Sequence, residues 1–193
     1  MGREFELKYA ALSPQQEALR AAFPGSWKSI AMETTYYDTP AGELSARRIT
    51  LRRRMENGVS VCTVKTPAPG GARGEWECEC DSIEKAVPEL CKLGAPQALL
   101  QWAGGELVPT CGARFTRQAL TLELESCTVE IALDHGCLLG GGQEQPLCEV
   151  EVELKAGNDA AAVAFAESLA AKFGLKPEKR SKFRRALALA KGE

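Results

Sequence analysis

Charged and apolar residues alternate in the segment Glu4-Phe5-Glu6-Leu7-Lys8, near the start of the chain. Successive side chains of a β-strand point to opposite faces of a sheet, so the segment predicts a strand with one charged face and one apolar face. A half-exposed strand ordinarily carries mixed polar side chains on its outer face. Here that face carries only ionised groups, two carboxylates and one ammonium, which indicates a specialised environment.

The same alternation recurs along the chain and predicts further strands at 49–54, 59–65, 73–80, 120–125, 128–133 and 148–155. Ser13, Ser82 and Asn158 are suited to cap the N-termini of helices between or after these strands, and a last basic helix is expected after Pro177. Strands do not alternate one by one with helices, as they would in a parallel sheet. We therefore expect an α+β protein with a mainly antiparallel sheet.

The size and charge of the chain exclude several classes of protein. Its 193 residues, 45% hydrophobic and 26% charged, are sufficient for one globular domain, and no apolar run approaches the roughly 20 residues of a membrane helix. The formal charge of -2 argues against a general nucleic-acid or anionic-membrane binder. We expect a single domain over 1–193, including C-terminal helices within 158–191, with no nucleic-acid or membrane partner.

Eight cysteines are spread along the sequence, and none form a CxxC pair. Structural zinc sites usually need two closely spaced ligand pairs, which argues against zinc here. The first residues do not form an apolar signal segment, so we expect a cytoplasmic protein with reduced thiols rather than structural disulfides. The sequence leaves the oligomeric state open.

The charged faces of the predicted strands are sorted by chemistry. Paired carboxylates recur two residues apart, and paired oxygens suit hard divalent ions such as Mg²⁺ or Mn²⁺. They are Glu4 with Glu6, Glu75 with Glu77, and Glu151 with Glu153. Arg and Lys side chains on the same faces suit phosphate oxygens. Unpaired buried charge is costly, so these groups need one another or a ligand. If the strands close into an eight-stranded antiparallel β-barrel with flanking helices outside, they line a charged tunnel.

These features together resemble the CYTH domain, or triphosphate tunnel metalloenzyme, superfamily. Besides the first strand, the resemblance extends over nearly the whole chain through Tyr36-Tyr37-Asp38-Thr39-Pro40, Leu51-Arg52-Arg53-Arg54, Thr63-Val64-Lys65, Arg73-Gly74-Glu75-Trp76-Glu77, Phe115-Thr116-Arg117, Ala132-Leu133-Asp134, residues 149–154 and Arg180-Ser181-Lys182. Within the superfamily the sequence is most similar to bacterial inorganic triphosphatases. The resemblance implies hydrolysis of inorganic triphosphate to pyrophosphate and phosphate, with Mg²⁺ or Mn²⁺.

The resemblance also implies roles for individual residues. The expected metal ligands are Glu4, Glu6, Glu75, Glu77, Asp134, Glu151 and Glu153. The expected substrate-binding residues are Lys8, Arg52, Arg54, Lys65, Arg73, Arg117 and Lys182. The expected catalytic group is Glu4, Glu6, Lys8, Glu75 and Glu77. One ion is expected at Glu4, Glu6 and Glu153, and a second nearer Glu75, Glu77 or Glu151.

Other functions remain open at this point. They are thiamine triphosphatase or another organic triphosphate phosphohydrolase, an adenylate cyclase, and a noncatalytic polyphosphate-binding module. The full set of carboxylates favours turnover, because a pure anion binder gains nothing from them. The basic run 176–185 is interpreted as a solvated helix face from which only Lys182 turns inward, and Tyr36 as a packing residue.

Overall fold

The structure, a computed structural model, describes the backbone of residues 2–67 and 73–193, and the side chains of 5–67 and 73–193. Met1, the side chain of Glu4 and residues 68–72 lie outside the described residues.

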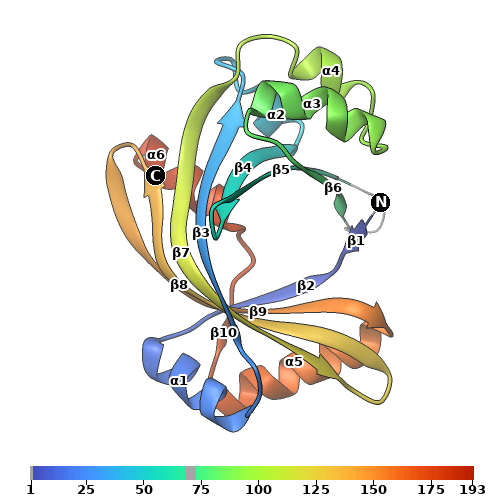
Figure 1. The fold of residues 1–193 in the computed structure, drawn as a ribbon. Coiled ribbons are helices and arrows are strands. Elements are labelled where there is room, and N and C mark those ends of the chain that lie inside the picture. Colours follow the sequence, from blue (N-terminus) through green and yellow to red (C-terminus); the bar gives the residue numbers. More distant parts are fainter. Residues whose placement is uncertain (1, 68–72) are drawn as a thin grey trace.

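Within the described residues, ten strands form one sheet in which every neighbouring pair is antiparallel (Figure 1). The hydrogen-bonded order is β1-β6-β5-β4-β3-β7-β8-β9-β2-β10. The strands are β1 Gly2–Glu4, β2 Glu6–Ala10, β3 Lys28–Asp38, β4 Thr50–Glu56, β5 Val59–Pro67, β6 Arg73–Glu79, β7 Val108–Glu123, β8 Cys127–Gly140, β9 Gln143–Gly157 and β10 Lys176–Pro177. The helices are α1 Ser13–Ala22, α2 Glu43–Ala46, α3 Ile83–Lys92, α4 Leu99–Trp102, α5 Asp159–Phe173 and α6 Lys182–Lys191. The α+β class and the antiparallel sheet are confirmed.

The predicted number of eight strands is wrong for the described sheet, because the first predicted strand is divided in two and because β3 and β10 were not predicted. β1 pairs with β6, whereas β2 pairs with β9, and only Phe5 lies between them. The N-terminal segment therefore links strands from opposite ends of the hydrogen-bonded order by a covalent connection. β1 and β2 are not neighbours in that order, so strand pairing within the described residues does not close the predicted barrel.

The sequence did not predict β3, and its predicted strand at 120–125 covers only the C-terminal end of β7. The buried residues of β3 do alternate, but two of the four, Thr34 and Asp38, are polar. The sequence of β3 therefore does not show the alternation of polar and apolar residues by which a strand is recognised. β7 begins at Val108, and small residues such as Gly112 and Ala113 obscure the alternation in its first half.

Two hydrophobic cores lie on the outer faces of the sheet, under helices. Leu51, Val64 and Trp76 of β4–β6 pack with side chains from α2, α3 and α4. On the other half of the sheet, Ile131 and Val150 belong to a core that includes residues of β2, α1 and α5. The alternate side chains of these strands are left for the opposite face, which carries the charges.

A third core lies on that opposite, inner face, contrary to the expectation that all apolar sides face outward. Phe183 and Ala186 of α6 pack with Met32 and Phe115. Phe115 is two residues from Arg117, so both point to the same side of β7. The C-terminal helix thus fills one end of the inner face with apolar side chains.

The cysteines and helices carry no sign of disulfides or membrane spans. All eight cysteines are free, and burial raises the pKa of the Cys62 thiol to about 12, which keeps it protonated and unreactive. In the described part of the chain no helix is both long and apolar enough to span a bilayer.

Gly140 is the point of closest approach between α6 and the sheet. A β-carbon at this position would lie 2.4 Å from the carbonyl oxygen of Ala186 and 2.6 Å from the amide nitrogen of Ala190. Both are backbone atoms, which cannot move without displacing the helix. The absent side chain at position 140 is therefore required for α6 to dock.

We predict that Gly140→Ala lowers the free energy of unfolding by about 1–3 kcal/mol, because overpacking forces the helix away from β8. Urea unfolding followed by circular dichroism measures this change. The control is Gly105→Ala, where a β-carbon meets no atom within 4 Å and the change should stay within about 0.5 kcal/mol. Equal stability of the two variants would contradict the docking described for α6.

Candidate functional site

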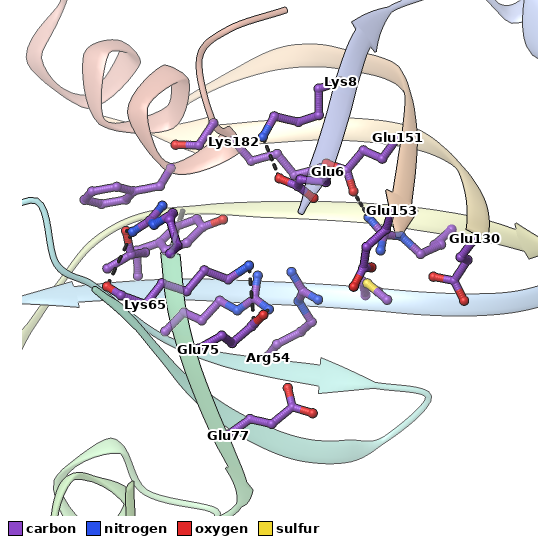
Figure 2. A pocket seen from close by; sticks show the side chains of 18 of the residues that line it. Glu6, Lys8, Arg54, Lys65, Glu75, Glu77, Glu130, Glu151, Glu153 and Lys182 are labelled. Carbon is purple, nitrogen blue, oxygen red and sulfur yellow. Dashed lines mark hydrogen bonds and ion pairs between the residues drawn. The ribbon is translucent and has the colours of Figure 1, made fainter. Parts of the chain in front are cut away.

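A cavity of about 640 Å³ is lined by charged side chains from both halves of the sheet and from α6 (Figure 2). Most of the side chains expected in the site line it: Glu6, Lys8, Arg52, Arg54, Lys65, Arg73, Glu75, Glu77, Arg117, Glu151, Glu153 and Lys182. Asp134 is fully buried and is not among the lining residues. The charged faces predicted for the separate strands therefore lie around one common cavity.

One side of the cavity is a cationic wall, formed by Arg52, Arg54, Lys65 and Arg73 of β4, β5 and β6. Arg54 is 7% exposed, and its Nε donates a hydrogen bond to Thr34 Oγ1 at 3.1 Å. Burial and the neighbouring charge of Arg52 lower the pKa of Arg54 to about 10, so it remains charged at neutral pH. Burial and this hydrogen bond restrict the rotamers of Arg54, so its guanidinium is already oriented for an anion in the cavity.

Glu75 is one of two described counter-charges of the cationic wall; the other is Glu56, whose Oε1 lies 3.4 Å from Arg54 Nη1. Glu75 Oε1 lies 3.3 Å from Lys65 Nζ and 3.7 Å from Arg52 Nη2. Distances above 3 Å indicate loose pairing, which an incoming anion can disturb at modest cost. Glu75 thus limits the repulsion between Lys65 and Arg52.

The opposite side of the cavity is a carboxylate row, made of Glu130, Glu153 and Glu6 on the adjacent strands β8, β9 and β2. Glu153 is the register partner of both other residues. Directly opposed side chains on paired strands have β-carbons about 5 Å apart, so like charges repel one another here. Burial, together with Glu130 and Glu6, raises the pKa of Glu153 although Lys155 opposes the shift. Within the described residues, two ammonium groups, those of Lys155 and Lys8, contact these three carboxylates, so the row keeps an excess of negative charge.

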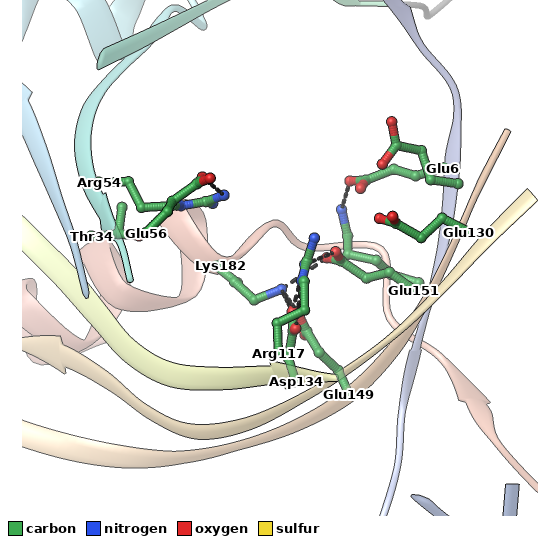
Figure 3. A network of polar contacts seen from close by, with 12 residues as sticks. Glu6, Thr34, Arg54, Glu56, Arg117, Glu130, Asp134, Glu149, Glu151 and Lys182 are labelled. Carbon is green, nitrogen blue, oxygen red and sulfur yellow. Dashed lines mark hydrogen bonds and ion pairs between the residues drawn. The ribbon is translucent and has the colours of Figure 1, made fainter. Parts of the chain in front are cut away.

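Between the two sides lies a compact ionic cluster around Lys182 (Figure 3). Lys182 Nζ lies 2.7 Å from Asp134 Oδ2 and 2.8 Å from Glu151 Oε1, and it also contacts Glu149. Arg117 binds both oxygens of Asp134 at 2.7 Å and contacts Glu151 at 2.5 Å. The two cations thereby join β7, β8, β9 and α6.

The cluster fixes the charges of its members. Burial alone would raise the pKa of Glu151, but Lys182, Arg117 and Lys8 outweigh it and hold that pKa well below the usual range. Burial would lower the pKa of Lys182, but its carboxylate neighbours, chiefly Glu151, raise it. Both groups are therefore charged over the whole neutral range.

Charged side chains of the cavity lining that were not among the predicted site residues include Glu130 and Lys155, and Arg185 was assigned to the wrong surface. Only the β8–β9 register, which the sequence does not state, brings Glu130 to Glu153, whereas Lys155 lies two residues from Glu153 on the same face of β9. Arg185 was expected on a solvated face, but it contacts the fully buried Glu149. The three-residue spacing of Lys182 and Arg185 puts both on one helix face, which is the signal that was available.

Two groups of carboxylates have the donor chemistry for a divalent metal ion. Oxygens of Asp134, Glu149 and Glu151 lie within 4.8 Å of one another, but the ammonium of Lys182 already contacts all three residues. Glu6 and Glu153, opposite each other in register, face the cavity instead. Oxygen donors from carboxylates suit Mg²⁺ and Mn²⁺, so these residues fit such an ion.

Comparisons with known proteins agree with the geometry. The profile of the CYTH domain matches residues 2–187. An inorganic triphosphatase of Haemophilus influenzae is 30% identical over 176 residues, which are 88% of this chain and 50% of that protein. The chain thus spans about half the length of this curated relative.

Solved structures share the fold. One, described as a putative adenylyl cyclase of Hippeastrum with a dominant triphosphatase activity, is 20% identical and covers 98% of this chain and 96% of its own, with a TM-score of 0.68. A Pyrococcus horikoshii protein is 25% identical and has a TM-score of 0.65; the match covers 97% of this chain and 99% of that protein's chain. The family predicted from the sequence is confirmed.

The ionic cluster predicts a specific dependence of stability on pH. Because the pKa of Glu151 is lowered on folding, its stabilising effect is complete above the unfolded pKa of about 4.5 and is lost as pH falls toward the folded value. We predict that Glu151→Gln lowers the free energy of unfolding by about 3–5 kcal/mol at pH 7, since it leaves buried cations short of a partner. The difference from the parent should shrink below pH 4.5.

Urea unfolding at several pH values tests this prediction. Glu144→Gln is the matched control, because it removes a carboxylate of β9 from an exposed pair with Arg114. An exposed ion pair contributes about 0–1 kcal/mol, so the control should change little. A Glu151→Gln variant that is as stable as this control at pH 7 would contradict the account of the cluster.

Proposed function

This chain belongs to the CYTH domain family, and we propose that it hydrolyses inorganic triphosphate to pyrophosphate and phosphate with the help of a divalent metal ion. The observation that supports this most strongly is the cavity with a cationic wall on one side and a carboxylate row on the other. A linear polyphosphate is an anion that binds hard cations, so it complements both sides at once. The name of the Haemophilus influenzae relative supports the same substrate.

We infer that the cationic wall holds the phosphate oxygens. Arg52 and Arg54 present forked guanidinium groups, which pair with two phosphate oxygens at a time. Lys65 and Arg73 extend the wall along β5 and β6. Phosphoryl transfer needs mainly positioning and charge neutralisation from the protein, and residues fixed on strands supply both.

Glu6 and Glu153 are the described residues that we assign to metal binding, and Glu4 joins them if its side chain follows the alternation of the first strand. A bound Mg²⁺ or Mn²⁺ supplies neutralising charge on the phosphate oxygens and acidifies the attacking water. Glu75 and Glu151 each lie beside two cations, whereas Glu6 and Glu153 each contact one ammonium among the described residues, so we assign Glu75 and Glu151 to charge balance rather than to a second ion. The same pairing with Arg117 and Lys182 removes Asp134 from our metal set.

Lys8, Arg117 and Lys182 lie between the two sides and would bind the part of the chain of phosphates that spans the cavity. Lys8 Nζ lies 2.7 Å from Glu6 Oε1, so it also orients a metal ligand. We infer that the cavity is a tunnel within a single domain, filled at one end by α6 and bridged by the N-terminal segment.

An organic triphosphate, such as thiamine triphosphate, is the second candidate, because apolar side chains also line the cavity. Met32, Tyr36 and Phe183 would be the surface for an organic group. They are each less than 10% exposed, and the rings of Tyr36 and Phe183 pack with centroids 5.0 Å apart. Little of their area is free for stacking, which favours the inorganic substrate.

We predict that the purified protein releases phosphate from inorganic triphosphate faster than from thiamine triphosphate or ATP. Activity should require Mg²⁺ or Mn²⁺ and disappear with excess EDTA, because without the ion the carboxylate row repels the polyphosphate and nothing acidifies the attacking water. Phosphate release with each substrate, with and without chelator, is the measurement. Triphosphate hydrolysis at the same rate in EDTA would contradict the metal requirement, and faster hydrolysis of an organic triphosphate would favour the second candidate.

We predict that Arg54→Ala reduces kcat/KM for triphosphate by about 30-fold or more, because truncating one partner of a desolvated charge pair costs about 2–5 kcal/mol. Arg53→Ala is the matched control, because Arg53 directly precedes Arg54 on β4, points to the other face and donates a hydrogen bond from Nε to Ser60 Oγ. Circular dichroism checks that both variants fold. If Arg54→Ala had the same kcat/KM as the parent, the assignment of the cationic wall to triphosphate binding would be wrong.

A further inference from the structure

Lys155 is the cation closest to the repulsive part of the carboxylate row. Its Nζ lies 2.8 Å from Glu153 Oε2 and 3.6 Å from Glu130 Oε1. The remaining carboxylate, Glu6, is paired instead with Lys8. One ammonium therefore serves two opposed carboxylates, at the position where repulsion within the row would otherwise be strongest.

Lys155 differs from Lys182, the buried ammonium of the ionic cluster. The side chain of Lys182 is 7% exposed and enclosed by three carboxylates, whereas that of Lys155 is 39% exposed. A lysine ammonium on a flexible four-carbon stem can exchange a carboxylate for water when it is this accessible. Lys155 is thus held in place by attraction to Glu153 and Glu130 rather than by packing.

The ammonium and a divalent ion would use the same oxygens. Glu153 is both the closest partner of Lys155 and, with Glu6, a residue assigned above to the metal ion. An ion at Glu153 would meet a positive charge within contact distance of its ligand, and that charge must move away for the ion to bind. Removal of the ammonium would leave the two carboxylates without a close cation among the side chains that the structure describes, and would raise their attraction for the ion.

We propose that Lys155 is a resident counter-ion of the metal site, which occupies Glu153 and Glu130 when the divalent ion is absent and is displaced when the ion binds. Lys155 thereby sets how tightly the protein holds its metal. This inference rests on the proposed function only in its assignment of Glu6 and Glu153 as ligands. It predicts that replacing Lys155 strengthens metal binding, which is the opposite of what loss of a stabilising or substrate-binding residue would do.

The test is calorimetric titration of the protein with MnCl₂ alone, without substrate, in dilute buffer at pH 7.5. Lys155→Gln should bind Mn²⁺ about tenfold more tightly than the parent, a change equivalent to about 1.4 kcal/mol. Lys155→Arg keeps the charge and should stay within about threefold of the parent. Lys179→Gln removes another lysine from the cavity lining and should change the affinity less than about twofold, which separates contact from general charge.

An affinity for Mn²⁺ in Lys155→Gln that is equal to or weaker than that of the parent overturns the inference, as does an equal gain in Lys179→Gln. If Lys155→Gln does not fold by circular dichroism, Lys155→Met, which retains the apolar stem, takes its place. Phosphate release from triphosphate is measured in parallel. An active parent with no gain in Mn²⁺ affinity on replacement of Lys155 refutes only this inference, whereas a parent that binds no Mn²⁺ refutes both it and the proposed metal site.

Discussion

The interior of the protein depends on one buried ammonium group, that of Lys182. It contacts three carboxylates, those of Asp134, Glu149 and Glu151. Three buried carboxylates on adjacent strands would repel one another strongly, so β8 and β9 cannot keep this register without a cation among them. That cation belongs to α6, a helix that also brings Phe183 into the apolar core at one end of the inner face. Docking of the C-terminal helix and assembly of the charged interior are therefore one event.

The remaining charges are divided between two sides. The outer faces of the sheet are occupied by hydrophobic cores under helices, so the charged alternate positions have only the interior to face. On the cationic wall the counter-charge is loose, and on the carboxylate row it is incomplete. The cationic wall can therefore still attract an anion, and the carboxylate row can still attract a cation. An anion that carries its own metal ion satisfies both, which neither a simple anion nor a metal ion alone would do.

The sequence predicted the family, the antiparallel sheet and the sharing of faces by charged residues, because a period of two determines which side chains point together. It did not predict β3, whose buried side chains are half polar, or the division of the first strand, which depends on pairing with distant strands. Glu130 was missed for the same reason, since only the register brings it to Glu153, whereas the position of Lys155 beside Glu153 follows from their two-residue spacing on β9. Most side chains expected in the site line the cavity, while their individual roles stay predictions.

The most direct test of the central claim is a crystal structure of the protein soaked with triphosphate and Mn²⁺, with anomalous scattering used to locate the ion. The account predicts a manganese peak beside Glu6 and Glu153 and phosphate density against Arg52 and Arg54. A peak among Asp134, Glu149 and Glu151, with Lys182 expelled, or triphosphate bound outside the cavity, would contradict it.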